Sequence, residues 1–220
     1  MSRSSIPYIA PFAVFIAFIA LHQVFALPDL ADQIVRVAAV GAVILFVSRP
    51  VLDFRVKRFF ATIAIGVAVF LLWIGPDLLW PSYRHFWLFS NSITGTARGS
   101  LSEGARSSAA VLALRSLRAV IIVPIVEELF WRAWLMRWII NPNFEKVPPG
   151  TYTASAFWIV AALFASEHGS YWDVGLAAGA IYNWWMVRTK SLGDLILTHA
   201  ITNACLCAYV IAAGKWEYWL

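Results

Sequence analysis

The chain has 220 residues, of which 61% are hydrophobic and only 13% are charged. Soluble globular domains contain about 25% charged residues, so this composition excludes an ordinary soluble domain as well as a disordered chain. The 17 Lys and Arg exceed the 12 Asp and Glu, and the formal net charge is +5. The basic residues lie at the ends of apolar segments, which is typical of a membrane protein and argues against nucleic-acid binding. The two cysteines, Cys205 and Cys207, lie in one apolar run, which excludes a disulfide scaffold.

Apolar segments follow one another along most of the chain. A helix that spans a membrane needs about 20 mostly apolar residues. Such helices are predicted at 8–26, 34–47, 59–74, 119–140, 154–168, 174–187 and 192–213. Residues 107–118 are predicted to form an interfacial helix or an eighth, partial span. The apolar run of the first segment is too long for a signal peptide, so we expect a retained helix. The predicted fold is all-α, a polytopic membrane bundle of about 7–8 transmembrane helices.

Lys and Arg residues predict the orientation of this bundle. They cluster in the loops after the second, fourth and sixth predicted helices, at Arg49, Arg55, Lys57, Arg58, Arg137, Lys146, Arg188 and Lys190. The positive-inside rule places such loops in the cytoplasm. With seven spans, all three loops follow even-numbered helices, so the N-terminus lies on the same side as these loops. We therefore expect a multi-pass integral membrane protein with a cytoplasmic N-terminus.

Two glutamates and an arginine interrupt the fourth predicted helix. A charge at the bilayer centre costs at least about 2.5–3.5 kcal/mol on insertion scales, so such residues usually face the protein interior and have a function. Glu128 and Arg132 are four residues apart and can form an ion pair on one helix face. Glu127 is rotated away from them by about 100° and is left to act as a general base. Pro124 predicts a kink just before this group. The alternative is a purely structural Glu128–Arg132 pair.

Two further polar groups fall in the fifth and seventh predicted helices. His168 follows Phe164 at the end of the fifth, and Glu167 beside it is expected to be solvated. His199 and Asn203 are four residues apart and share a face of the seventh, which is otherwise apolar. The alternatives are an interfacial histidine and an interhelical hydrogen-bonded pair. A rise of about 1.5 Å per residue puts all three groups near the middle of the bilayer, where they can meet around one cavity.

These three groups together resemble the motifs of the CAAX protease and bacteriocin-processing family of intramembrane proteases, also called the Abi family. Its best-known branch is the CAAX prenyl protease of the Ras-converting type. The family pattern is E-E-x-x-x-R, F-x-x-x-H and H-x-x-x-N, which stands here as Glu127-Glu128 with Arg132, Phe164 with His168, and His199 with Asn203. The resemblance extends from Pro124 to Val210. Ala133 stands where the family often has glycine, a difference that affects packing more than chemistry.

The resemblance implies a glutamate-type endopeptidase. Glu127, helped by His168, would activate a water molecule to attack the scissile carbonyl. His199 and Asn203 would stabilise the oxyanion that forms. Glu128 and Arg132 would pair and support the site. The family mechanism implies no metal and no other cofactor.

The resemblance also implies a partner and a division of the chain. The substrate would be a peptide or protein, prenylated or anchored in membrane lipid, that is cut near its C-terminal end. The short chain points to a member from a prokaryotic plasma membrane. Residues 1–105 would form N-terminal transmembrane helices and a lid or linker loop, and residues 106–220 the catalytic domain.

Three other functions remain open on the sequence. Two His and a Glu can bind zinc with a water molecule as the fourth ligand, as in metalloproteases. H-E-x-x-H is absent, however, and H-x-x-E-H would need a histidine where Phe164 stands. A non-catalytic scaffold or immunity protein would use the polar groups only to hold helices together. A proton-coupled transporter would show inverted repeats and broken helices, and neither is clear here.

Overall fold

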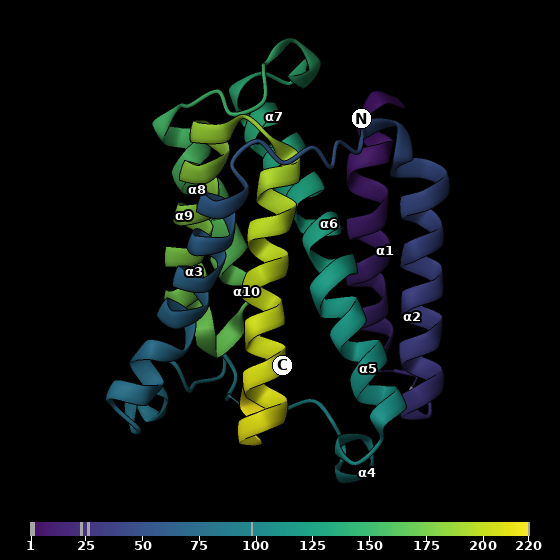
Figure 1. The fold of residues 1–220 in the computed structure, drawn as a ribbon, viewed down its shortest axis with the longest axis vertical. Helices are drawn as coiled ribbons and strands as arrows, with labels where there is room; N and C mark the ends of the chain where they lie inside the picture. Colours follow the sequence, from purple (N-terminus) through teal and green to yellow (C-terminus); the bar gives the residue numbers. More distant parts are fainter. Residues whose placement is uncertain (1–2, 23, 26, 98, 220) are drawn as a thin grey trace.

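The computed structural model describes residues 3–22, 24–25, 27–97 and 99–219. Within these residues the chain forms helices and no named β-strand. The helices stand side by side as a bundle (Figure 1). They are α1 (Ile6–His22), α2 (Asp29–Val43), α3 (Phe59–Leu79), α4 (Glu103–Arg106), α5 (Ala109–Leu117), α6 (Val123–Glu128), α7 (Met136–Ile140), α8 (Ala154–Ser166), α9 (Trp172–Thr189) and α10 (Leu192–Ala213). The predicted all-α bundle is confirmed. Gln23 and Ala26, at the end of the first predicted segment, lie outside the described residues.

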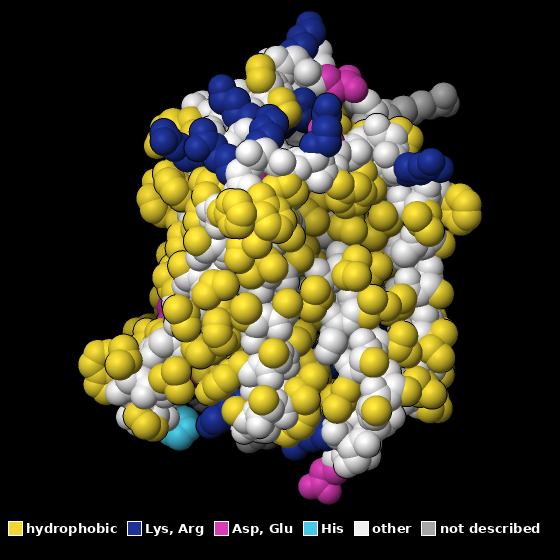
Figure 2. Space-filling view, in the orientation of Figure 1, with side chains coloured by type: hydrophobic (Ala, Val, Ile, Leu, Met, Phe, Trp, Pro, Cys, Tyr) yellow, Lys and Arg dark blue, Asp and Glu magenta, His cyan; other side chains and the backbone are white. Residues whose placement is uncertain are grey.

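The outer surface and the length of the helices identify a membrane protein. Four helical stretches are long and apolar enough to cross a membrane: Asp29–Val51, Phe59–Leu79, Ala109–Ile140 and Leu192–Ala213. α1 and α8 are apolar but shorter. The middle of the molecule is covered by hydrophobic side chains, whereas Lys and Arg gather at its upper end (Figure 2). We conclude that the chain is an integral membrane protein, and the exact number of spans stays a prediction.

The segment predicted as an interfacial helix or an eighth span is neither of these. Residues 107–118 mostly belong to α5, which continues through α6 and α7 as one helical stretch, Ala109–Ile140, of 32 residues. Two π-helical segments, Arg118–Ile122 and Leu129–Leu135, connect its three α-helical parts. The first of these segments ends two residues before Pro124, and the kink predicted there stays a prediction. Sequence hydropathy cannot detect this continuity because Arg115 and Arg118 interrupt the apolar pattern.

Hydrogen bonds to side chains fix the beginnings of α8, which ends two residues before His168, and of α10, which carries His199. The hydroxyl of Thr153 accepts a hydrogen bond from the N–H of Ala156 and caps α8. Ser191 caps α10 in the same way by accepting from the N–H of Asp194. α10 ends at Gly214, whose φ of 66° lies in the left-handed region that glycine adopts without strain.

The helices before residue 105 and those after it share one core. Phe12 of α1 and Val69 of α3 are buried in the same cluster as Val126 of α6 and Leu195 of α10. α3 and α10 approach so closely that a Cβ on Gly66 would lie 2.7 Å from the carbonyl oxygen of Thr198. The two parts of the chain are therefore packed together. The predicted division near residue 105 only separates the part that contains the predicted catalytic residues from the part that does not, and it stays a prediction.

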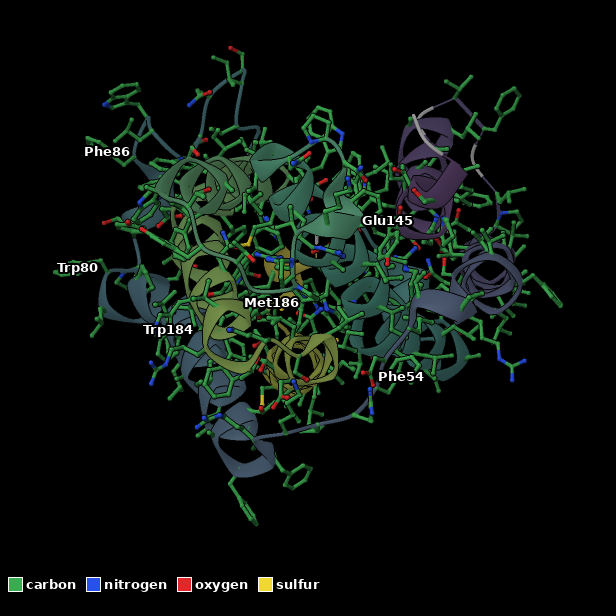
Figure 3. The ribbon with its side chains drawn as sticks, turned by 90° about the horizontal axis from the view of Figure 1, so that it is seen from above. Phe54, Trp80, Phe86, Glu145, Trp184 and Met186 are labelled. Carbon is green, nitrogen blue, oxygen red and sulfur yellow. The ribbon has the colours of Figure 1, made fainter. Side chains whose placement is uncertain are left out.

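The view along the bundle separates core from periphery. Met186 of α9 lies near the middle of the helices, and 1% of its surface is exposed (Figure 3). Trp80 and Phe86, in the loop after α3, lie at the outer edge (Figure 3). Exposed aromatic side chains near helix ends are typical of the interface between a membrane and water.

Candidate active site

The π-helical turn Arg118–Ile122 in the long helical stretch Ala109–Ile140 leaves one backbone carbonyl free to accept a hydrogen bond from α10. In the segment Arg118–Ile122 the bonds are of the π type, and the N–H of Val123 donates to the carbonyl of Arg118, five residues earlier. The next donor in this register would be the N–H of residue 124, but proline has none. The carbonyl of Ala119 is therefore open, and Nδ2 of Asn203 donates to it at 2.8 Å. Such π-bulges occur frequently at functional sites.

Glu128 and Arg132 form the predicted ion pair in the centre of the bundle. Nη1 of Arg132 lies 3.2 Å from Oε1 of Glu128, and both side chains are fully buried. Nε of Arg132 also donates to Oδ1 of Asn183 at 2.9 Å, across to α9. The guanidinium group lies 4.4 Å from the ring centre of Phe164. One ion pair therefore joins the long helix to α8 and α9.

His199 joins this pair through a contact that the sequence does not predict. Its Nδ1 lies 2.9 Å from Oε1 of Glu128. A carboxylate accepts hydrogen bonds, so Nδ1 carries the proton and Nε2 is left for other partners. The ring lies 5.0 Å from that of Tyr182, whose hydroxyl donates to Thr202. Glu128 thus orients His199 as well as binding Arg132.

Glu127 has surroundings unlike those of Glu128. Only 7% of its surface is exposed. Its Oε2 atom is buried and has no hydrogen-bond partner among the described residues. Glu167 is exposed as predicted, but it also lines the same cavity. Glu127 is therefore a buried carboxylate with an unsatisfied oxygen, which is typical of a group that binds water or a ligand.

His168 is oriented by the backbone of α8. Its Nδ1 lies 2.7 Å from the carbonyl oxygen of Phe164. Since a carbonyl can only accept, Nδ1 carries the proton of the neutral ring and Nε2 has the lone pair. The edge of Trp73 packs on the ring, with 5.1 Å between ring centres. Gly175 of α9 provides space for the His168 ring, because a Cβ at this position would lie 3.2 Å from Nδ1.

A single cavity brings these residues together. It has a volume of about 230 Å³, and its wall includes Glu127, His168, His199 and Asn203. Glu128 and Arg132 lie behind this wall, fully buried. Apolar and aromatic side chains complete most of the wall, which also includes Arg115 of α5 and Arg118 directly after it. All four residues predicted to be catalytic thus line one largely apolar cavity.

The turn that carries His168 is held by a group that sequence reasoning missed. Arg84 contacts the carboxylates of Asp77 and Asp173 and donates to the carbonyl of Ser170 at 2.8 Å. The hydroxyl of Tyr218 donates to Asp77 at 2.8 Å. Burial, and then this hydrogen bond, raise the pKa of Tyr218. The only sequence signal was one Arg in a loop between two acidic residues that are far apart in the chain.

Asn183 is the second residue that was missed. It is fully buried in α9 and donates from Nδ2 to the carbonyl of Phe157 while it accepts from Arg132. An asparagine inside an apolar helix could have indicated this role.

The described residues contain no group of three or more His, Cys, Asp or Glu side chains that is placed to hold a metal ion.

Comparison with known proteins identifies the segment that carries the site. Residues 109–205 match a family model described as type II CAAX prenyl endopeptidase, Rce1-like. The matched segment begins at α5 and contains Glu127, His168, His199 and Asn203, the four cavity residues that were predicted to be catalytic. The corresponding searches find no match among curated proteins and none among solved structures.

Proposed function

We propose, from the premise that residues 109–205 belong to the Rce1-like family of type II CAAX prenyl endopeptidases, that the protein is a glutamate-type protease acting inside the membrane. The family makes it a CAAX-type intramembrane protease in general terms. The catalytic mechanism and the substrate are the parts that we propose. The observation that supports them best is the buried, unsatisfied carboxylate of Glu127 on the wall of a cavity that it shares with two histidines.

In the proposed mechanism Glu127 is the general base. A water molecule between Glu127 and His168 loses a proton to the carboxylate and attacks the scissile carbonyl carbon. Nε2 of His168 accepts a hydrogen bond from this water, because its Nδ1–H is bound to the carbonyl of Phe164. The proton taken by Glu127 then passes to the leaving amine as the C–N bond breaks.

Donors on α10 would stabilise the oxyanion. One N–H of the Asn203 amide is bound to Ala119, and the other remains for the substrate oxygen. His199 can donate from Nε2 only as an imidazolium ion, and the carboxylate of Glu128 at 2.9 Å stabilises that cation. The largely apolar surroundings make such donors more effective than they would be in water.

The test is peptide cleavage by protein purified in detergent and reconstituted in lipid. Wild type, Glu127→Gln and Glu145→Gln are compared on a farnesylated CAAX peptide and on the same peptide without the lipid. Glu145 is an exposed glutamate in the loop after α7 and serves as the matched control (Figure 3). We expect cleavage by wild type and control, and a loss of at least about 100-fold in Glu127→Gln.

A chelator and added zinc separate the metalloprotease alternative from this proposal. Cleavage that persists in chelator and disappears with Glu127→Gln supports the glutamate mechanism. Cleavage lost in chelator and restored by zinc would overturn it. If wild type cuts neither peptide under any condition, the proposed protease activity on these substrates is wrong, and the scaffold alternative gains support.

We also propose that the N-terminus and the basic loops are cytoplasmic, in a prokaryotic plasma membrane. The Lys and Arg side chains at one end of the molecule support this orientation (Figure 2). Tyr171, Tyr218 and Trp219, which line the cavity, follow α8 and α10 at the opposite end. The catalytic cavity then lies in the half of the bundle away from the cytoplasm.

Cysteine labelling tests the orientation. Asn143→Cys marks the loop after α7, and Ile93→Cys marks the opposite end, where Ile93 is 94% exposed. Both are made in a chain whose two native cysteines are replaced by alanine. A maleimide that does not cross membranes should label Ile93→Cys in intact cells, and Asn143→Cys only after permeabilisation. The reverse pattern would invert the proposed orientation.

A further inference from the structure

A second cavity, the outer cavity, adjoins the catalytic one at the end of the bundle where α3 and α10 finish (Figure 1). It has a volume of about 710 Å³, and its wall includes the charged side chains of Asp77, Arg84, Lys215 and Glu217. One water molecule needs roughly 10–15 Å³ of such space together with polar partners. The outer cavity is therefore large and polar enough to hold many water molecules, and the proposed mechanism gives it no role.

Two tyrosines separate the outer cavity from the catalytic cavity. Tyr171 and Tyr218 line both, and no other described residue belongs to both walls. Their ring centres are 5.2 Å apart. Tyr171 is also close to the proposed chemistry, because its N–H donates to the carbonyl of His168 at 2.8 Å. The route from the outer cavity to His168 therefore leads past these two rings.

One ion pair holds both tyrosines in place. The carboxylate of Asp77 accepts from the hydroxyl of Tyr218 at 2.8 Å and from Nε of Arg84 at 2.9 Å. The guanidinium group of Arg84 lies 4.4 Å from the ring centre of Tyr171, in a cation–π contact. The hydroxyl of Tyr171, in contrast, is buried and has no hydrogen-bond partner among the described residues. Buried polar groups normally bind protein or water, so this hydroxyl is suited to a water molecule between the two cavities.

The catalytic cavity consumes water but is poorly suited to store it. Each peptide bond that is cut takes up one water molecule, whose hydroxyl joins the acyl carbon and whose proton goes to the leaving amine. The wall of the catalytic cavity includes Trp73, Phe164 and Leu206, and apolar cavities tend to stay dry. The bilayer core around the bundle supplies no water either. Water must therefore be delivered along the bundle from one of its ends.

We propose that the outer cavity supplies the water for hydrolysis, and that Tyr171 and Tyr218 form a gate between the two cavities. The hydrogen bond from Tyr218 to Asp77 keeps this gate closed, and its release lets water reach Glu127 and His168. This inference rests on the proposed function, because hydrolysis is the step that consumes the water. It assigns a role to a cavity and to two residues that take no part in the chemistry itself.

A native cysteine reports on the gate without any need for proteolysis. Cys207 lines the catalytic cavity and packs in one cluster with Tyr171 and Tyr218. Cys205→Ala makes it the only cysteine of the chain. The rate at which a charged, water-soluble methanethiosulfonate modifies Cys207 is then measured in detergent. Tyr218→Phe keeps the ring but removes the hydrogen bond to Asp77, and we expect modification to be about 2- to 10-fold faster. Tyr152→Phe, at an exposed tyrosine before α8, is the matched control and should leave the rate unchanged.

Filling the outer cavity tests the same route in the opposite direction. Thr96→Trp places a large ring in the wall of the outer cavity. Ile93→Trp places the same ring on the same loop, where Ile93 is 94% exposed and lines neither cavity. We expect Thr96→Trp to slow the modification of Cys207. It should also lower kcat for peptide cleavage and leave KM unchanged, because water enters only the chemical step. Ile93→Trp should match the parent protein in both measurements.

The two readouts distinguish failure of the gate from failure of the proposed function. If Cys207 responds to Tyr218→Phe and Thr96→Trp as expected but no peptide is cut, the gate is supported and the proposed function is wrong. Equal modification rates in these two variants and their controls would overturn the gate. A rise in KM with unchanged kcat in Thr96→Trp would also overturn it, because the outer cavity would then bind peptide instead of supplying water. Equal Tm values show that the variants compared are folded.

Discussion

Oε1 of Glu128 receives two cationic or protonated partners, Nδ1 of His199 at 2.9 Å and Nη1 of Arg132 at 3.2 Å. The preceding residue, Glu127, has a buried Oε2 with no partner among the described residues. Oε2 of Glu128 is likewise buried and without a partner among the described residues, so the two adjacent glutamates differ in their other contacts. Glu128 is held through Oε1 and links three helices, whereas Glu127 has no such contact and lines the cavity. This difference determines what each substitution should do.

Glu128→Gln should lower both stability and activity, in contrast to Glu127→Gln. The amide removes the negative charge that lies against Arg132 and His199 and leaves a buried guanidinium group uncompensated, a loss of about 3–5 kcal/mol. Glu127→Gln removes no hydrogen bond and should keep the wild-type Tm. The measurement is the Tm in detergent, followed by intrinsic fluorescence, together with peptide cleavage. An equal fall in Tm for the two variants would contradict the assignment of roles.

Arg132→Gln should reduce the yield of folded protein, because it leaves Glu128 buried with one partner fewer and removes the link to Asn183. Arg132→Lys should have an intermediate effect, since lysine keeps the charge but not the planar fork that reaches both Glu128 and Asn183. Size-exclusion profiles of the two variants and wild type give the measurement. A wild-type profile and Tm for Arg132→Gln would show that the pair contributes little.

Gly175→Ala should impair catalysis with little loss of stability. The new Cβ would lie 3.2 Å from Nδ1 of His168, so the ring must shift by a few tenths of an ångström from the geometry set by Phe164. A misplacement of about 1 Å can cost about 100-fold in rate, so we expect this smaller shift to cost less than that. Gly75→Ala in α3 is the control, because nothing lies within 4 Å of its Cβ. The two variants are compared for kcat at equal Tm, and equal kcat would remove the steric argument.

Pro124→Ala should reduce activity while it maintains or increases stability. Alanine restores an N–H at position 124, which can donate to the carbonyl of Ala119 and so compete with Asn203. Asn203 would then lose the anchor that orients its second N–H toward the cavity. We expect kcat to fall about 10-fold. The loss should not exceed the loss caused by removing one oxyanion donor completely. Pro149→Ala, in an exposed loop, is the control. Unchanged kcat would show that Asn203 is positioned without this anchor.

The sequence alone determined the class of fold and the composition of the candidate site. Long apolar segments predict membrane-spanning helices, because in a membrane every backbone polar group must be paired within its own segment. Charged residues in such segments are costly, so Glu127, Glu128, Arg132 and His199 stand out without any structure. Their i, i+4 spacings also predict the Glu128–Arg132 contact, which is local to one helix.

Only the tertiary structure decided how these groups divide their roles. The contact between His199 and Glu128 joins residues 71 positions apart, and that between Arg132 and Asn183 joins residues 51 apart. No helical periodicity predicts such pairs, because they depend on how the helices are rotated and how closely they pack. The same holds for the bond from Asn203 to Ala119, which exists because a π-turn and a proline leave one carbonyl open. Local chemistry selected the residues, and helix packing determined which of them are satisfied and which remain free to act.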